Sequence, residues 1–189
     1  VAVDHQTGHV TVQAGIRLGA LNRLLDEHGL AMPNLGTIDV QSIAGAISTA
    51  THGTGLRYGT LSSFVVRLRL VLASGEVVET SADNHPALFQ AARTGLGCIG
   101  IITEVTLACV PKFNIQMWQS AASFDEALDQ LDDYLENERF GLWWYPHTDK
   151  VRLWTSNSTQ QPADPVSFWT RAKTRFKDVV LLNRGHEAA

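Results

Sequence analysis

The sequence predicts an α+β fold, in which antiparallel hairpins are combined with separate amphipathic helices. Apolar and polar residues alternate on both sides of short turns at residues 4–8 and 73–76, a pattern typical of hairpins. Leucines recur at helical spacing over residues 17–28, and Gly29 follows where a helix usually ends. With 189 residues, of which 44% are hydrophobic, the chain is long enough to bury a substantial core.

Charge and hydropathy exclude several classes of protein. Fifteen lysines and arginines stand against nineteen acidic residues, so the formal net charge is -4 and lacks the basic excess that nucleic-acid binding requires. No apolar run is long enough for a membrane-spanning helix, and the N-terminal residues lack the pattern of a signal peptide. We therefore expect a cytoplasmic protein without a nucleic-acid partner, and association with a membrane surface is the less favoured alternative.

Further elements follow along the first part of the chain. Strands at residues 65–72 and 77–78 form a second hairpin. Asn84 is placed to cap a helix that has Pro86 in its first turn. An apolar run at residues 99–110 predicts another strand.

The composition changes at Pro111, where we predict a domain boundary. Tryptophans and acidic residues concentrate beyond this point. Ser123 and Glu126 have the spacing of a capping box, which predicts a helix that extends to about Leu135. The predicted domains are residues 1–111 and 112–189, and the second contains this helix, strands at 140–145 and 151–155, and a helix after Asp164.

Residues 95–100 match the glycine pattern G-x-G-x-x-G of dinucleotide-binding folds. In those folds the pattern lies between a strand and the following helix, so that the helix N-terminus meets a pyrophosphate. Here a helix precedes the pattern and a strand follows it. We therefore interpret the segment as a tight helix-to-strand turn, which argues against a nicotinamide-dependent dehydrogenase.

The run of small residues at 42–55 is the most informative stretch. Small side chains let a ligand approach the backbone closely, and Ser42 is placed to cap a short helix. The first N–H groups of that helix, at Ala44, Gly45 and Ala46, would then be free to bind an anion such as a diphosphate. The alternative is that two backbone segments pack closely there inside a core.

The sequence predicts neither a metal site nor a hydrolase site. His52 and His147 lack a partner at metal-ligand spacing, so we interpret them as a histidine bonded to neighbouring backbone and as a turn residue. No G-x-S-x-G motif is present. Cys98 and Cys109 lie in apolar runs and are interpreted as buried, reduced thiols, with a disulfide or a nucleophile as the alternative.

Several motifs together resemble a known family. Residues 51–55 (Thr-His-Gly-Thr-Gly) follow Pro-Asn-Leu-Gly-Thr at 33–37 and Ser-Ile-Ala-Gly at 42–45, and Trp-Tyr-Pro-His-Thr comes later at 144–148. With these motifs the chain resembles the vanillyl-alcohol-oxidase-type (PCMH-type) FAD-binding fold. Within that superfamily it is similar to the sugar-lactone and alditol oxidases, and the resemblance extends over most of the chain. This resemblance implies part of an FAD-binding domain followed by the start of an α+β substrate cap domain.

The resemblance also implies FAD as the cofactor and assigns contacts to it. Gly36 and Thr37 would lie beside the flavin ring. Ser42 and Gly45 would lie at the diphosphate. The remaining implied contacts are Thr49, Ala50, Thr51, His52 and Gly53 along the ribityl chain and phosphates, and Ile101 and Ile102 near the adenine.

For the intact protein, the resemblance implies oxidation of a C–OH group of a sugar-derived lactone or polyol, with dioxygen as electron acceptor and hydrogen peroxide as product. Family members are considerably longer, so we expect this chain to be a fragment that is inactive alone. The alternatives are a truncated, non-catalytic module that needs the missing segments or a partner, and a dehydrogenase that uses another electron acceptor. Gly36, which lacks a methyl group, would admit dioxygen to the flavin; alternatively, Gly36 supplies a positive φ in a turn.

Overall fold

The computed structural model describes residues 1–162, and the helix predicted after Asp164 lies outside this part of the chain. Val1–Thr159 form one compact unit. It contains two larger sheets and two clusters of buried apolar side chains. Among the described residues, no helix has the length and apolar character needed to cross a membrane. The predicted α+β class is confirmed.

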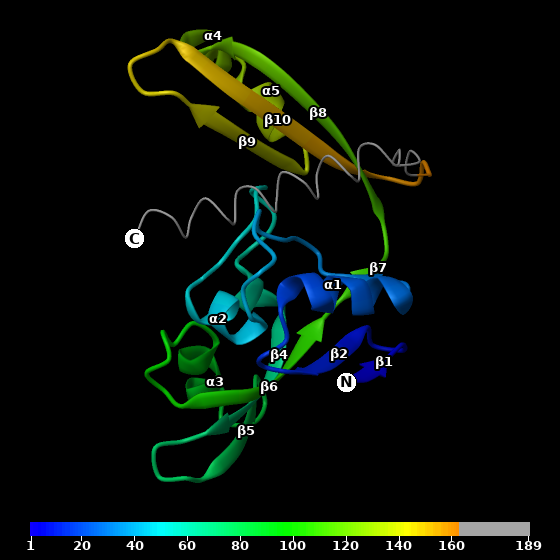
Figure 1. Cartoon of the computed structure of the whole chain (residues 1–189), viewed down its shortest axis with the longest axis vertical. Helices are drawn as coiled ribbons and strands as arrows, with labels where there is room; N and C mark the ends of the chain where they lie inside the picture. The colour runs from blue at the N-terminus through cyan, green and yellow to red at the C-terminus, as the bar shows by residue number, and fades with distance from the viewer. Residues whose placement is uncertain (163–189) are drawn as a thin grey trace, which may run out of the picture. The chain divides into compact units, whose positions relative to one another are not determined.

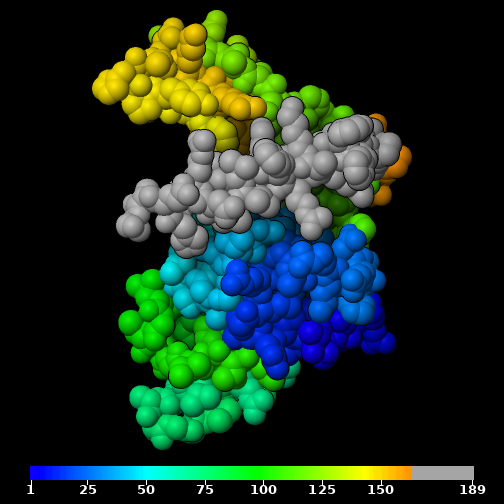
Figure 2. All heavy atoms as spheres, in the orientation of Figure 1, coloured from blue at the N-terminus to red at the C-terminus, as the bar shows by residue number. Residues whose placement is uncertain are grey.

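Five antiparallel strands form the larger sheet: in sheet order, β1 (Ala2–Asp4), β2 (His9–Gln13), β6 (Ile101–Ala108), β4 (Val65–Val71) and β5 (Val77–Ser81) (Figure 1). Both predicted hairpins are present, since β1 pairs with β2 and β4 pairs with β5. β6 lies between the hairpins, although it is the last of the five in sequence. β1 is an edge strand, and its dark blue atoms lie on the visible surface in Figure 2.

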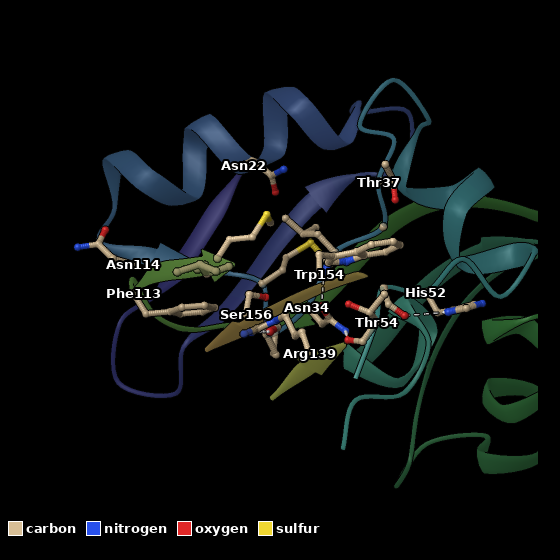
Figure 3. Close-up of a pocket in the computed structure, with 18 of the residues that line it drawn as sticks. Asn22, Asn34, Thr37, His52, Thr54, Phe113, Asn114, Arg139, Trp154 and Ser156 are labelled. Carbon is tan, nitrogen blue, oxygen red and sulfur yellow. Dashed lines mark hydrogen bonds between the residues drawn. The ribbon is translucent and has the colours of Figure 1, made fainter. Parts of the chain in front are cut away.

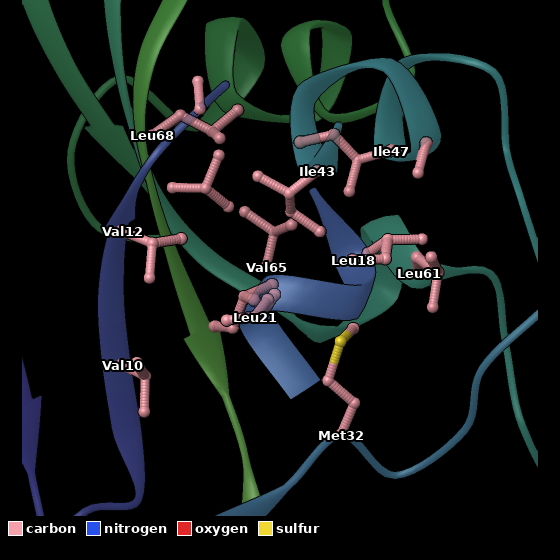
Figure 4. Close-up of a cluster of buried hydrophobic side chains, with 14 of the residues drawn as sticks. Val10, Val12, Leu18, Leu21, Met32, Ile43, Ile47, Leu61, Val65 and Leu68 are labelled. Atoms are coloured by element: carbon pink, nitrogen blue, oxygen red, sulfur yellow. The ribbon is translucent and has the colours of Figure 1, made fainter. Parts of the chain in front are cut away.

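The first core lies between this sheet and helices (Figure 4). Val12 of β2, Leu21 of α1 (Leu18–Glu27) and Ile47 of α2 (Ile43–Ser48) are all buried in it. α1 matches the helix predicted over residues 17–28, and α2 begins at its predicted cap. Apolar spacing in the sequence therefore places these helices correctly.

Helix α3 (Pro86–Arg93) differs from the prediction at its start. His85, with a φ of 52°, is the N-cap, so the prediction that Asn84 caps this helix is wrong. The Asn84 side chain donates to the Glu79 carbonyl at 2.6 Å and fixes the turn before the helix. Pro86 can begin the helix without a side-chain cap because its ring fixes φ near the helical value.

Residues 95–100 connect α3 to β6 as the predicted helix-to-strand turn. Gly97 has a φ of 77°, which glycine adopts without strain. Gly100 passes so close to β4 that an added Cβ would lie 2.6 Å from the Val71 carbonyl oxygen. The glycines of this segment therefore serve a tight chain reversal.

The two cysteines differ in exposure. Cys109 is buried as predicted, and burial raises its pKa to about 11. Cys98 is exposed, so the prediction that it is buried is wrong. The chain turns at the surface there, and its neighbour Leu96 is itself 71% exposed and does not cover it.

A second, three-stranded antiparallel sheet consists, in sheet order, of β8 (Asn114–Ser123), β10 (Lys150–Thr159) and β9 (Arg139–Trp144). β9 and β10 form the predicted hairpin. β8 is not among the predicted strands, because both of its faces are largely exposed and its sequence lacks apolar alternation. Before β8, the short strand β7 (Val110–Pro111) pairs with β3 (Leu30–Ala31).

Two short helices, α4 (Phe124–Asp129) and α5 (Leu131–Leu135), pack on the second sheet. The predicted capping box is present: the Ser123 hydroxyl accepts from the Glu126 N–H at 3.2 Å, and a Glu126 carboxylate oxygen accepts from the Ser123 N–H at 2.9 Å. The structure divides the single predicted helix at Gln130. The fully buried apolar residues of this cluster are Ala127, Val151 and Leu153.

Candidate functional site

A cavity of about 840 Å³ has one wall on the loop after β3 and the other on the three-stranded sheet (Figure 3). Residues 30–37 and 52–54 supply most of the first wall, and residues from 112–119, β9 and β10 supply the second. Cavities of this size are typical of small-molecule sites. Four of the predicted cofactor contacts line it: Gly36, Thr37, His52 and Gly53.

Asn34 and Gly53 hold the first wall together. Asn34 is buried, and its side-chain amide donates to the Thr54 carbonyl at 2.8 Å. Gly53 approaches residues 34–35 so closely that an added Cβ would lie 2.2 Å from the Leu35 carbonyl oxygen. Gly53 therefore packs closely against another backbone segment, as the alternative requires, but it does so in the cavity wall and not inside a core.

Gly36 does not owe its place to a positive φ, since the structure gives it none. That alternative interpretation is therefore wrong. An added Cβ would lie 3.3 Å from both the His52 carbonyl oxygen and a Thr51 methyl carbon, which is tight but within reach of a small adjustment. Because Gly36 has no side chain, residues 51–52 can approach this part of the cavity wall closely.

The first N–H groups of α2 are already bonded within the protein. Ile43 N–H donates to the Ile16 carbonyl at 2.9 Å and Ala44 N–H to the Ala14 carbonyl at 3.1 Å. Gly45 N–H donates to the Ser42 hydroxyl at 3.2 Å. Ala46 N–H donates to the Ser42 carbonyl at 2.9 Å. The prediction of free N–H groups at Ala44, Gly45 and Ala46 is therefore wrong, because the loop before α1 and the cap use the donors that an anion would need.

Unused backbone donors lie instead just before α2. Within the described part of the chain, the N–H groups of residues 36–40 have no acceptor. Thr37 is exposed, as are the apolar side chains of Ile38 (59%) and Val40 (61%). This segment therefore offers hydrogen-bond donors and apolar surface side by side.

The other predicted contacts do not line the cavity. Thr49 closes α2, with its hydroxyl donating to the Gly45 carbonyl at 3.0 Å. Ala50 has a φ of 56°, an uncommon and strained value for a residue with a side chain. Thr51 accepts from the Leu61 N–H at 2.8 Å. The remaining two are Ile101 and Ile102 at the start of β6, the first 70% exposed and the second packed against the first core.

His52 is exposed, and its Nδ1 lies 2.9 Å from the Gly53 carbonyl, as the interpretation of a histidine bonded to neighbouring backbone requires. His147 lies in the β9–β10 turn with a φ of 66°. Among residues 1–162, no three His, Cys, Asp or Glu side chains form a group that could hold a metal ion.

One face of the three-stranded sheet forms the second wall. Because side chains alternate along a strand, Met117 and Gln119 of β8, Arg152 and Trp154 of β10, and Trp143 of β9 share this face. The Arg152 guanidinium donates to the Gln119 side-chain oxygen at 2.7 Å. None of these residues is among the predicted contacts, and the clustering of tryptophans after Pro111 is the sequence signal that points to this face.

Arg139 connects the two walls. Its guanidinium is buried and donates to the Pro33 carbonyl at 3.0 Å and to the Tyr58 hydroxyl at 3.2 Å. It also pairs with Glu138 at 2.9 Å and lies over the rings of Tyr58 and Phe113. Hydrogen bonding from the Ser158 side chain, aided by the Ser158 N–H and Arg139, lowers the pKa of Glu138.

These residues fit part of an FAD molecule. A flavin ring has carbonyl oxygens and ring nitrogens that accept hydrogen bonds, and the N–H groups of residues 36–40 are unused donors beside the cavity. The exposed side chains of Leu35, Ile38 and Val40 offer apolar contact to a ring or ribityl chain. At the start of α2, by contrast, a ligand could approach the backbone closely at the exposed Gly45, but the N–H groups there are not free to bind it.

Known structures support the fold. A solvent-stable cholesterol oxidase superposes with a TM-score of 0.77 at 22% identity, over 87% of this chain and 35% of that one. Cholesterol oxidase from Brevibacterium sterolicum superposes with a TM-score of 0.73 at 24% identity, over 84% of this chain and 34% of that one. At these identities the likeness shows the fold alone.

Sequence comparisons are more specific. Residues 1–81 match the FAD binding domain family and residues 105–188 match the D-arabinono-1,4-lactone oxidase family. L-gulonolactone oxidase of Bos taurus is 40% identical over 88% of this chain and 38% of its own length. D-arabinono-1,4-lactone oxidase of Kluyveromyces lactis is 42% identical over 88% of this chain and 32% of its own length. The chain thus spans about a third of the length of these relatives, and over most of its own length it is similar to FAD-binding sugar-lactone oxidases.

Proposed function

We propose that the full-length protein oxidises a C–OH group of a sugar-derived lactone or polyol, with dioxygen as electron acceptor. The observation that carries this proposal is the shared cavity, where Gly36 and Thr37, which begin the donor-rich loop at residues 36–40, lie in one wall and the aromatic face of the second sheet forms the other. A site of this kind can hold a flavin ring on one side and a small polyol on the other. A cytoplasmic location remains a prediction from the sequence.

We also propose that residues 1–111 belong to the FAD-binding domain and that residues 112–189 begin the cap domain. Support comes from the two family matches, which lie on either side of residues 82–104. The two clusters of buried apolar residues are also separate in sequence. The substrate cavity would then lie where the two domains face each other.

When bound, FAD supplies a hydride acceptor and a route for electrons to dioxygen, which yields hydrogen peroxide. In this proposal Gly36 and Thr37 contact the flavin ring, Ser42 and Gly45 approach the diphosphate, and residues 49–53 follow the ribityl chain and phosphates. Ile101 and Ile102 contact the adenine. The N–H groups at the start of α2 are already bonded within the protein. Helix α2 would therefore contribute side-chain hydroxyls and close backbone approach to the diphosphate site.

On the opposite wall, the second sheet would bind and orient the lactone. Arg152 presents a guanidinium and Gln119 an amide to the cavity, and both can bond sugar hydroxyl or carbonyl oxygens. Arg139 of β9 holds the two walls together, because its guanidinium donates to the Pro33 carbonyl and to the Tyr58 hydroxyl. Together these groups would exclude water from the space between flavin and substrate.

The experiment that tests the proposal uses the purified full-length protein. We expect bound flavin, loss of the flavin absorbance when D-arabinono-1,4-lactone or L-gulono-1,4-lactone is added without oxygen, and recovery with release of peroxide when oxygen is admitted. Bleaching that only an artificial electron acceptor reverses would indicate a dehydrogenase. If neither lactone nor a polyol bleaches the flavin, the result would contradict the proposal and favour a non-catalytic module.

Gly36 allows a sharper test of the oxidase assignment. A methyl group at this position would stand in the cavity wall without backbone strain, so Gly36→Ala should leave flavin reduction by lactone near normal. We expect reoxidation by dioxygen to slow more than tenfold, which corresponds to about 1.4 kcal/mol in the barrier. Gly15→Ala is the matched control, because Gly15 has no positive φ and no atom within 4 Å of an added Cβ. Equal slowing of both half-reactions would contradict a gating role for Gly36.

A further inference from the structure

We propose that Trp154 is the wall against which the sugar ring of the substrate stacks, and that Gly141 is the positioning residue that holds the indole in place. The inference rests on the proposed function, and it adds a binding role for two residues of the second sheet. It is carried by the contact between two neighbouring strands and by the position of Trp154 in the cavity wall (Figure 3).

The indole of Trp154 lies directly on the backbone of the neighbouring strand. Trp154 of β10 is the cross-strand partner of Gly141 in β9. A Cβ added to Gly141 would lie 2.1 Å from one carbon of the six-membered ring of Trp154 and 2.4 Å from another. No side chain at position 141 can share this space with the ring, so glycine is required for the indole to lie across β9.

Trp143 fixes the same indole from the side. Its ring centroid lies 5.2 Å from that of Trp154, at an interplanar angle of 62°, which is a favourable edge-to-face contact. Both tryptophans line the cavity, with Trp143 54% exposed and Trp154 half-buried. The pair is therefore held rigidly while part of its surface remains available to a ligand.

Polar groups lie at the edge of this aromatic surface. Arg152 is the cross-strand partner of Trp143, and Gln119 is the partner of Trp154 on the other side. A lactone of the sugar series has C–H groups on a ring face and hydroxyl oxygens at its rim. An indole face can cover the C–H groups while a guanidinium and an amide bond the oxygens, so the chemistry of this wall matches a sugar ring.

A purely structural role would leave a different signature. β9 is an edge strand, and an aromatic ring that covers a glycine stabilises such a strand. That role predicts a loss of thermal stability when the indole is removed, with unchanged kinetics. Substrate stacking predicts a higher KM with kcat nearly unchanged, because binding is lost equally from the ground state and the transition state.

The test compares variants of the full-length holoenzyme with D-arabinono-1,4-lactone as substrate. Trp154→Leu should raise KM about tenfold and leave kcat within about twofold. Gly141→Ala, which displaces the indole, should raise KM to a similar extent. Combined with Trp154→Leu, it should add little, because the flexible leucine can turn away. Trp118→Leu is the matched control: Trp118 is also exposed, but lies on the opposite face of the same sheet, beside Thr155, and its KM should not change.

The outcomes separate the inference from the function on which it rests. A wild-type flavin that the lactone fails to reduce contradicts the proposed function, and the inference falls with it. Active wild-type enzyme with an unchanged KM in Trp154→Leu contradicts the inference alone, and a lower melting temperature would then identify a structural role. Additive increases in KM for Gly141→Ala and Trp154→Leu would show that Gly141 does not act through the indole. If Gly141→Ala does not fold, the comparison of Trp154→Leu with Trp118→Leu still decides the stacking role.

Discussion

The two sheets of this protein use their apolar residues differently. In the five-stranded sheet, strand residues such as Val12, Leu68 and Leu70 are at most 1% exposed and pack beneath helices. In the three-stranded sheet, β8 contains no fully buried residue, and the second core has only Ala127, Val151 and Leu153 fully buried among the described residues. Packing therefore constrains the first region, whereas the second leaves a sheet face open to line a cavity.

The contacts between the two regions differ from those inside the first core. Apolar contacts dominate inside the first core, but a charged side chain, Arg139, joins the second sheet to the loop at Pro33. A buried guanidinium is costly unless its donors are bonded, and here a carbonyl, a hydroxyl and a carboxylate accept from it. We infer that substitutions in the first core change stability most, and that substitutions in the second region change the cavity.

Truncation of one leucine in each core should give the largest contrast. Leu21→Ala removes a side chain that is 0% exposed among close-packed neighbours and should lower the free energy of unfolding by about 4 kcal/mol. Leu153→Ala should lower it by about 2 kcal/mol, because its partly exposed neighbours can relax into the space. Urea denaturation of both variants measures the difference. A larger loss for Leu153→Ala would contradict the comparison.

Substitution of Arg139, which connects the two regions, should have the next largest effect on stability. Arg139→Ala removes one of the donors to Glu138 and the guanidinium donor to the Pro33 carbonyl and the Tyr58 hydroxyl, and it should cost about 3 kcal/mol, with weaker flavin retention. Arg139→Lys should be intermediate, because an ammonium group cannot reproduce the guanidinium fork. The control is Arg69→Ala: its pair with Glu104 is 3.5 Å long and exposed, so the loss should be less than about 1 kcal/mol. Similar losses for both alanine variants would refute a special role for Arg139.

The lowered pKa of Glu138 predicts a smaller, pH-dependent effect. Its carboxylate is bonded to Ser158 and Arg139 in the folded state, so the unfolded state takes up a proton first as the pH falls below about the ordinary value of 4.5. The stabilisation is complete above that value and is lost as the pH falls through the lower folded pKa. Denaturation curves between neutral and acidic pH should fall more steeply for wild type than for Glu138→Gln. Parallel curves would show that Glu138 is not linked to folding.

The cysteines provide the smallest perturbation. A thiol reagent at mildly alkaline pH should label Cys98 rapidly, because it is exposed, and leave stability unchanged. Cys109 should react only after denaturation, because it is buried and its pKa is raised to about 11. Mass spectrometry of labelled peptides distinguishes the two. Rapid labelling of Cys109 would mean that the edge of the first core opens readily.

Sequence reasoning was most successful where a local rule decides the structure. The leucine spacing of α1 and the capping box at Ser123 are both present as predicted, because each depends on residues a few positions apart. The N-cap predicted at Asn84 is instead His85, because the Asn84 side chain bonds the Glu79 carbonyl in the preceding turn. Strand β8 could not be predicted, because a strand that is largely exposed on both faces shows little hydrophobic alternation.

The sequence motifs indicate residues of only the first wall of the cavity. Gly36, Thr37, His52 and Gly53 belong to motifs contiguous in sequence, and they line the cavity together. The second wall depends on strand register, which brings Trp154 opposite Gly141 over a long sequence separation. Likewise, the bonding of the α2 N–H groups by Ala14 and Ile16 depends on tertiary contacts that no local pattern encodes.

The measurement that tests the account most directly is the rate of flavin reduction by D-arabinono-1,4-lactone without oxygen, in two variants of one strand. Gln119→Trp adds bulk to the cavity face of β8, and Gln116→Trp adds the same bulk to the opposite face. If the lactone is oxidised in the shared cavity, subsaturating lactone should reduce the flavin at least about tenfold more slowly in Gln119→Trp, a change of about 1.4 kcal/mol, and at the wild-type rate in Gln116→Trp. Equal rates in the two variants, with flavin bound in both, would contradict the placement of the reaction in this cavity.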